Sequence, residues 1–140
     1  MRKKRRDPKT TSRIMSAIHS KNTRPERLLE KLLKRNKIKF KKHYQLTGSP
    51  DFVIEDRRIA IFVDGDFWHG HNWKLRGMKN QKTELDSYNK FWRNKIINNI
   101  KRDKKSNLSL KKLGWKVKRI WESDLKNNPK KIYKSIYELF

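Results

Sequence analysis

The sequence predicts one α/β domain in which helices flank a central mixed β-sheet. Two short apolar runs, at 51–54 and 59–63, lie back to back as paired strands do, and residues 115–121 alternate between apolar and basic. Apolar residues recur at helical spacing in the segments 23–36 and 84–113. With 140 residues, the chain is long enough for one domain with a modest core.

The N-terminal part divides into an arm and the start of the domain. Residues 1–11 are basic and are predicted to form a flexible arm, whereas residues 12–140 are predicted to form a single domain. The segment 12–20 carries enough apolar residues for a short helix.

The first long helix has a recognisable start. Thr23 can cap it, Pro25 suits its first turn, and Glu26 stands at the capping-box position. Asn36 is expected to end it. The residues at helical spacing that would face the core are Leu28, Leu29, Leu32 and Leu33.

The sheet is expected to follow this helix. Residues 38–44 alternate between apolar and basic, as an exposed or edge strand does. The runs 51–54 and 59–63 form a hairpin, although the residues between them are not a favoured hairpin turn. The segment 65–81 is irregular and long for a loop in a small domain, and such loops often carry function.

The C-terminal part is predicted to be a helix, a strand and a helix. Residues 84–113 form one long helix that ends at Gly114, and residues 115–121 form a strand. Asn128 and Pro129 begin the last helix.

The composition predicts a nucleic-acid partner. The formal net charge is +25, and a field of that size favours a polyanion, although a lysine-rich proteome would explain part of it. The absence of cysteine excludes disulfides, thiolate zinc sites and thiol nucleophiles. No segment resembles a signal peptide or a membrane span, so we expect a cytoplasmic, nucleoid-associated protein with no membrane partner.

Carboxylates and imidazoles gather at the ends of the two hairpin strands. Asp51 opens the first strand, and Asp64 and Asp66 follow the second. Such carboxylates can hold Mg²⁺, but each could also serve only as a cap of a turn or strand. His69 is a candidate general base because its ordinary pKa lies near neutrality. His71 is as compatible with an exposed loop residue as with a function.

The aromatic pair Phe67 and Trp68 lies in the same polar segment. These rings could insert between DNA bases, or they could anchor the loop in the core.

Two acidic residues depend on tertiary placement for their interpretation. Glu26 is explained by the capping box unless its helix start faces Asp51. Asp103 shares a helical face with Asn99 and could accept the ring proton of His69, or it could be a neighbour of surface lysines. A hydrolase would require Asp51 and His69 to converge on one cation and one water.

These segments together resemble the very-short-patch repair (Vsr-type) DNA mismatch endonucleases, within the restriction-endonuclease-like superfamily. The resemblance runs from about Ser12 to about Leu125. Its pieces are Arg13–Ile18 (RIMSAI), Thr23–Glu26 (TRPE), Pro50–Val53 (PDFV), Ile61–His71 (IFVDGDFWHGH), Phe91–Trp92, Asn99–Asp103 (NIKRD) and Leu113–Glu122 (LGWKVKRIWE).

The resemblance implies a three-layer core and a Mg²⁺-dependent endonuclease that nicks one strand at T:G mismatches. It implies that Asp51 and the backbone carbonyl of Val63 bind one or two Mg²⁺, and that Glu26 holds metal-bound water. His69 would be the catalytic histidine and Asp103 its carboxylate partner. The implied intercalating residues are Phe67, Trp68 and Met15.

The chain also departs from the family pattern. Many members hold a structural zinc with cysteines and a histidine, but here Asp66, Trp73 and Ser123 stand at the cysteine positions, beside His71. The resemblance therefore implies that structural zinc is absent. Phe62 and Asp64 occupy the second acidic and the lysine positions of the PD-(D/E)xK signature, and Asp64 could hold metal-bound water instead.

Double-stranded DNA, mismatched, is the expected partner, and the expected state is a monomer with any helper repair proteins unidentified. Two alternatives use the same fold. One is a restriction-type nuclease or nickase that cuts intact duplex, and the other is a catalytically inactive DNA-binding module.

Overall fold

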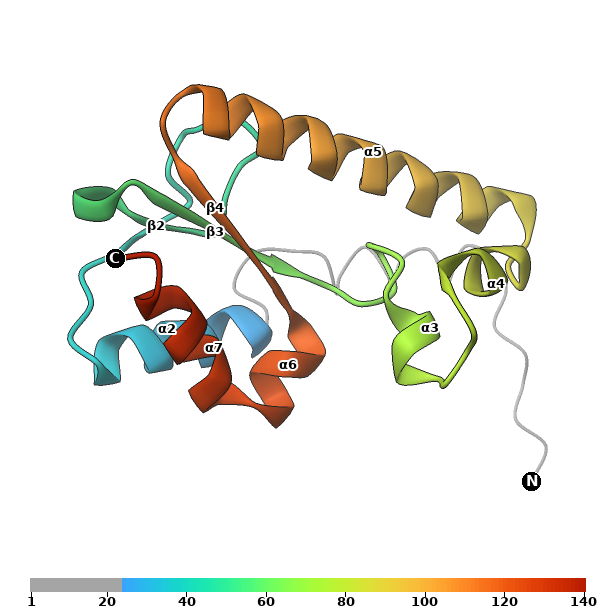
Figure 1. Cartoon of the computed structure of the whole chain (residues 1–140), viewed down its shortest axis with the longest axis horizontal. Coiled ribbons are helices and arrows are strands. Elements are labelled where there is room, and N and C mark those ends of the chain that lie inside the picture. The colour runs from blue at the N-terminus through green and yellow to red at the C-terminus, as the bar shows by residue number, and fades with distance from the viewer. Residues whose placement is uncertain (1–23) are drawn as a thin grey trace.

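The computed structural model of the protein describes residues 24–140 (Figure 1). These residues form a mixed four-stranded sheet in the order β1-β2-β3-β4, in which β1, β2 and β3 are antiparallel neighbours and β3 pairs with β4 in parallel. The strands are β1 (Lys41–Lys42), β2 (Phe52–Ile54), β3 (Ile59–Asp64) and β4 (Lys116–Trp121). The helices are α2 (Arg24–Arg35), the 3-10 turn η1 (Glu55–Arg57), α3 (Asn72–Leu75), α4 (Gln81–Asp86), α5 (Lys90–Lys112), α6 (Glu122–Asn127) and α7 (Pro129–Tyr137).

The sheet separates two apolar cores, which confirms the predicted α/β layers. Successive residues of β3 face opposite sides of the sheet. Ile59 and Ile61 join the larger core, which α2, α6 and α7 cover, and Ala60 and Phe62 join a smaller one beneath α5. Figure 1 shows α5 along one side of the sheet and these three helices on the other. The same alternation points Asp64, the last residue of β3, to the α5 side.

Several predicted elements are confirmed. The hairpin pairs Phe52 with Ile61 and Ile54 with Ile59, and η1 and the left-handed residue Arg58 (φ 52°) make its turn. The strand β4 and the last helix, which begins at Pro129, also form where the sequence predicts them. Thr23, Met15 and the proposed arm at 1–11 lie outside the described residues.

The prediction of one helix over 84–113 is wrong. The chain forms α4, breaks at 87–89, and begins again as α5. Each start has its own asparagine cap, since the Asn80 side chain accepts the Thr83 amide at 2.9 Å and the Asn89 side chain accepts the Trp92 amide at 3.0 Å. The side-chain caps of Asn80 and Asn89 thus mark two separate helix starts.

The strand predicted at 38–44 is shorter than expected, and two helices, α3 and α6, were not predicted. Only Lys41 and Lys42 pair with β2, because His43 takes a left-handed conformation (φ 52°) that ends the strand. The six-residue α6 directly follows β4. Among residues 24–140, no helix combines the length and the apolar character needed to cross a membrane.

Candidate active site

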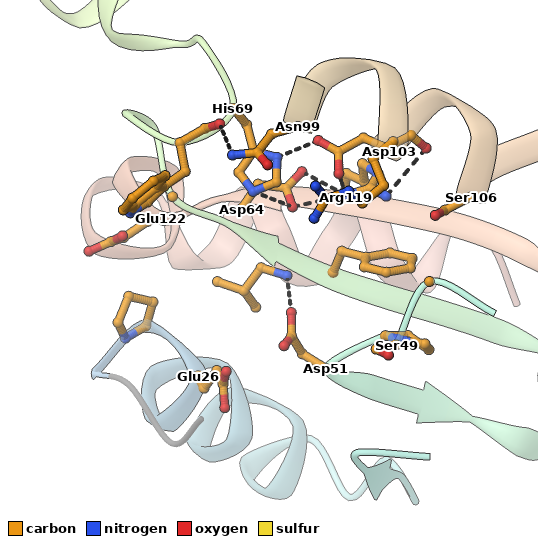
Figure 2. Close-up of a pocket in the computed structure, with 18 of the residues that line it drawn as sticks. Glu26, Ser49, Asp51, Asp64, His69, Asn99, Asp103, Ser106, Arg119 and Glu122 are labelled. Atoms are coloured by element: carbon orange, nitrogen blue, oxygen red, sulfur yellow. Dashed lines mark hydrogen bonds and ion pairs between the residues drawn. The ribbon is translucent and has the colours of Figure 1, made fainter. Parts of the chain in front are cut away.

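A cavity of about 500 Å³ lies at the carboxyl end of β3, and residues of both α2 and α5 line it (Figure 2). The sheet explains its position, because β3 ends between a helix on each face and the loop after it turns across the opening. The ionisable side chains that line this cavity include six from six different segments: Glu26, Asp51, Asp64, His69, Asp103 and Arg119. Asp51 directly precedes β2 and His69 lies in the loop after β3, and both side chains line this one cleft.

Asp51 and Glu26 form a carboxyl pair on the α2 side of the cavity. Glu26 is only 6% exposed, and the start of its helix faces Asp51. The Asp51 Oδ2 atom accepts the backbone amide of Val63 at 2.7 Å (Figure 2). Burial raises the pKa of Asp51 to about 7 against the lowering effect of that amide, with further raising contributions from Glu26 and Asp64. Asp51 contacts Val63 through the N–H group of that residue, and cation binding by the Val63 carbonyl stays a prediction.

His69 and two more carboxylates form a second group on the α5 side. Nδ1 of His69 makes a hydrogen bond with Oδ2 of Asp103, and Nε2 lies 3.7 Å from Oδ1 of Asp64. Burial lowers the pKa of His69, but the hydrogen bond with Asp103 and the charges of both carboxylates outweigh it and raise the pKa above its ordinary value. Asp103 is thus placed to fix the ring orientation and to leave Nε2 facing the cavity.

Arg119 joins this second group from β4. Its Nη1 atom lies 3.0 Å from Asp64 Oδ1 and 3.3 Å from Asp103 Oδ1, so one guanidinium contacts both carboxylates. Burial raises the pKa of Asp64, while His69 and Arg119 oppose that rise.

A polar stripe on α5 organises these contacts. Asn99, Asp103 and Asn107 are spaced by four residues and therefore share one helical face. Asn99 Nδ2 donates to the Trp68 carbonyl at 3.1 Å, and Asn107 Oδ1 accepts from Arg119 Nε at 2.8 Å. One helix face thereby holds the loop after β3, the His69 ring and the Arg119 guanidinium.

Asp66 and His71 lie apart from the cavity group and pair with each other. Asp66 Oδ1 contacts His71 Nδ1 at 2.7 Å and accepts from the Ser123 hydroxyl at 2.8 Å, and Asp66 Oδ2 accepts from the Ser123 amide at 3.1 Å. The His71 ring stacks on Trp121, with ring centroids 4.0 Å apart. This network attaches the loop after β3 to the start of α6, and His71 is buried, not an exposed loop residue.

Trp73 does not belong to that network. Its backbone amide donates at 2.6 Å to the fully buried Glu84, whose other oxygen accepts from the Tyr88 hydroxyl at 2.9 Å. Glu84 therefore connects α3 to α4.

Phe67 and Trp68 belong to an aromatic cluster at the start of α5. Phe67 lies 5.7 Å from Trp92, Trp68 lies 5.9 Å from it, and Trp68 is only 4% exposed. Phe91, packed on Trp92, is 59% exposed, and Lys95 lies 5.1 Å above the Trp68 ring. The cluster brings one exposed ring and one ammonium group to the surface beside the two rings that the sequence singled out.

The residues that sequence reasoning missed come from β4 and α5. Arg119 lies within an alternating strand, where a basic residue predicts only solvent exposure. Its parallel register opposite Phe62 places it beside Asp64, and no local pattern gives that register. Lys95 and Asn107 likewise belong to a basic, polar helix in which many residues carry the same signal.

Comparisons with known proteins identify the family. The family model of the DNA mismatch endonuclease Vsr matches residues 4–75. The chain is 39% identical over 137 residues to the type II nicking enzyme V.HpaIIP of Haemophilus parainfluenzae, a match that covers 94% of each chain. It is 36% identical over 125 residues to the DNA mismatch endonuclease Vsr of Escherichia coli (strain K12), covering 89% of this chain and 76% of that protein.

A solved structure has the same fold. The catalytic domain of the homing endonuclease I-Bth0305I aligns with a TM-score of 0.56 and 23% identity, and the match covers 84% of this chain and 94% of that domain. This likeness bears on the fold alone, and it agrees with the restriction-endonuclease-like core that the sequence predicts. The extent of the sequence matches shows that the chain belongs to the Vsr family and is a DNA endonuclease.

Proposed function

We propose that this endonuclease nicks one strand of DNA at T:G mismatches and depends on Mg²⁺. The observation that carries the proposal is the convergence of two pairs, Asp51 with Glu26 and His69 with Asp103, on opposite walls of one cavity. Strand cleavage requires a cation near the scissile phosphate and a base near the attacking water. The Asp51–Glu26 pair is suited to hold the cation, and the His69–Asp103 pair is suited to supply the base.

Asp51 would hold the cation, together with the carbonyl of Val63, and Glu26 would hold water beside it. The donor atoms are all oxygens, which suits a hard cation such as Mg²⁺. The raised pKa of Asp51, near a second carboxyl group, fits this role, because a bound cation would offset the cost of ionising a buried acid. When bound, the ion would neutralise charge on the scissile phosphate and stabilise the leaving oxygen.

His69 would act as the general base. With its Nδ1 hydrogen donated to Asp103, the neutral ring carries its lone pair on Nε2, which faces Asp64 and the cavity. Nε2 would take a proton from the attacking water, and the charges of Asp103 and Asp64 would stabilise the imidazolium that results. Asp64 therefore acts on the base and needs no direct contact with the phosphate.

The surface beside the cavity would engage the mismatch. The high positive charge supplies salt-sensitive affinity for the DNA backbone. Phe67 and Trp68, with Met15 from the N-terminal segment, would insert beside the mispaired bases, where unstacking costs less than in paired duplex. Because Trp68 is buried against Trp92, Phe67 and the exposed Phe91 are the rings that can meet DNA first.

A second candidate substrate is intact duplex with a short recognition site. Relatives named type II nicking enzymes motivate it, among them one from Neisseria meningitidis serogroup C that is 36% identical over 122 residues. The two candidates share the cleavage chemistry and differ only in what the cavity must receive.

Nicking assays on a panel of strand-labelled duplexes test both candidates. With Mg²⁺ we expect one nick in the thymine strand of T:G duplexes, and with EDTA none. Equal nicking of the fully paired duplex would favour the second candidate, and no nicking of any duplex would refute both.

Two variants assign the site. Asp51→Ala should lower the nicking rate by about 10³-fold or more, with DNA affinity in fluorescence anisotropy changed by less than about threefold. Asp56→Ala is the matched control, because Asp56 is an exposed carboxylate on the same hairpin. Equal losses of rate and affinity in Asp51→Ala would argue against its role as a cation ligand.

A further inference from the structure

Arg119 is held within the cavity by contacts on several sides. Its side chain is 19% exposed, and Nη1 contacts both oxygens of Asp64, at 3.0 and 3.2 Å, and Oδ1 of Asp103 at 3.3 Å. The Asn107 side chain accepts from Nε at 2.8 Å. The guanidinium also lies 4.0 Å from the centroid of the Phe62 ring, and Phe62 is the register partner of Arg119 on β3.

These contacts fix the guanidinium more firmly than an ordinary surface ion pair. A planar guanidinium presents its donors in fixed directions, and here a strand neighbour stacks on its face while a helix residue holds its edge. Arg119 is therefore organised before DNA arrives. Two of the groups it touches are carboxylates that surround His69.

Within residues 24–140, the carboxylates of Asp64 and Asp103 form, together with His69, a group that has the geometry of a metal site. Potential ligand atoms of Asp64, His69 and Asp103 lie within 4.8 Å of one another. A divalent cation among them would lie close to the guanidinium, and like charges at such a distance repel each other strongly in a buried site. Arg119 already provides the positive charge that these carboxylates attract.

We propose that Arg119 is a positioning residue, a fixed cation that holds the Asp103 carboxylate against His69 and keeps a divalent ion out of the Asp64–His69–Asp103 group. The inference rests on the proposed role of His69 as the base. Cation binding to the protein is then confined to the Asp51 side of the cavity. The groups that act on the pKa of His69 include Asp64 from β3, Asp103 from α5 and Arg119 from β4, and burial and Arg119 favour the neutral ring.

The first test is the pH profile of single-turnover nicking. In Arg119→Met we expect the rate to fall about 10- to 100-fold and the acidic limb to move to higher pH by about one unit, because His69 loses a neighbouring cation. Arg119→Lys, which keeps the charge, should leave the limb near its original position. The control Lys118→Met removes a positive charge from the adjacent position of β4, on the opposite face of the sheet, and should not move the limb.

A slower Arg119→Met enzyme with an unshifted limb would overturn the proposal, because a merely structural role lowers the rate without changing the titration of the base. Circular dichroism and thermal melting confirm that each variant is folded at the assay temperature.

The second test measures cation binding without any cleavage. In the Asp51→Ala background, Mn²⁺ titration followed by electron paramagnetic resonance should detect no tightly bound ion. Adding Arg119→Met should create one Mn²⁺ site, and adding Asp103→Ala should remove it again. If Arg119→Met adds no site, Arg119 does not exclude the ion and the proposal fails. Since neither nicking nor Asp51 is involved, failure of the proposed function would not affect this result.

Discussion

Replacing Asp51 by Asn should stabilise the cation-free protein while it abolishes cleavage. The Asp51 carboxyl is partly buried beside Glu26, and this burial is the main cause that raises its pKa from an ordinary value of 3.8 to about 7. Above pH 7 the folded protein therefore carries an ionised acid in an unfavourable place. Asparagine keeps an oxygen for the Val63 amide, which Asp51 accepts at 2.7 Å, but carries no charge.

The size of the effect follows from the shift in pKa. A rise from 3.8 to about 7 corresponds to a ceiling of about 4 kcal/mol in the free energy of unfolding. Because neighbouring groups and water relax around the charge, we expect a gain of about 2 kcal/mol, or roughly 7 °C in Tm for a chain of this length.

The sign of the pH dependence is fixed by the direction of the shift. The folded-state pKa is raised, so neutral Asp51 contributes fully below about pH 4, and that contribution is lost as pH rises to about 7. The difference between Asp51→Asn and the parent protein should therefore vanish near pH 4 and reach its maximum near pH 8.

Thermal and urea unfolding in EDTA, from pH 4 to pH 8, measure this difference. Asp56→Asn is the control, because its exposed carboxylate should give no gain at any pH. Mg²⁺ at about 100 times its dissociation constant should stabilise the parent by about 2.7 kcal/mol and leave Asp51→Asn unchanged. An Asp51→Asn protein that is less stable than the parent at pH 8, or a gain independent of pH, would refute the reasoning.

Three further predictions concern the base, the loop network and the aromatic cluster. Asp103→Asn should shift the acidic limb of the nicking profile to lower pH, opposite to Arg119→Met, and slow nicking about 10²-fold, because His69 loses the hydrogen bond that raises its pKa. An unchanged limb would exclude the pairing. Asp66→Ala should lower the free energy of unfolding by roughly 2–4 kcal/mol in urea titrations, because the buried His71 ring and the partly buried Ser123 lose their shared acceptor. A loss below about 0.5 kcal/mol would mean that water replaces the network. Phe67→Ala should lower the ratio of T:G to paired-duplex nicking about 10-fold with overall affinity within about threefold, as competition assays can measure, and a uniform loss of affinity would indicate a packing role.

Local sequence patterns were sufficient for the elements that are organised locally. The hairpin over 51–64, β4 and α7 follow from alternation and from the Asn128–Pro129 start, and their physics involves only neighbouring residues. The break between α4 and α5 follows from the cap at Asn89, which a search for long apolar periodicity overlooks. The edge strand was overestimated because its alternation continues through His43, whose left-handed backbone no periodicity indicates.

The sequence by itself determined the chemical inventory: a strongly basic chain without cysteine, the acids Asp51 and Asp64 at strand ends, His69 beyond them, and the family to which they belong. The tertiary structure alone decided how these groups are partnered. The parallel register of β3 and β4 sets Arg119 opposite Phe62, and α5 crosses the sheet so that Asp103 meets His69. Such pairings depend on strand order and on helix packing between residues that lie far apart in the chain, which no local interaction specifies.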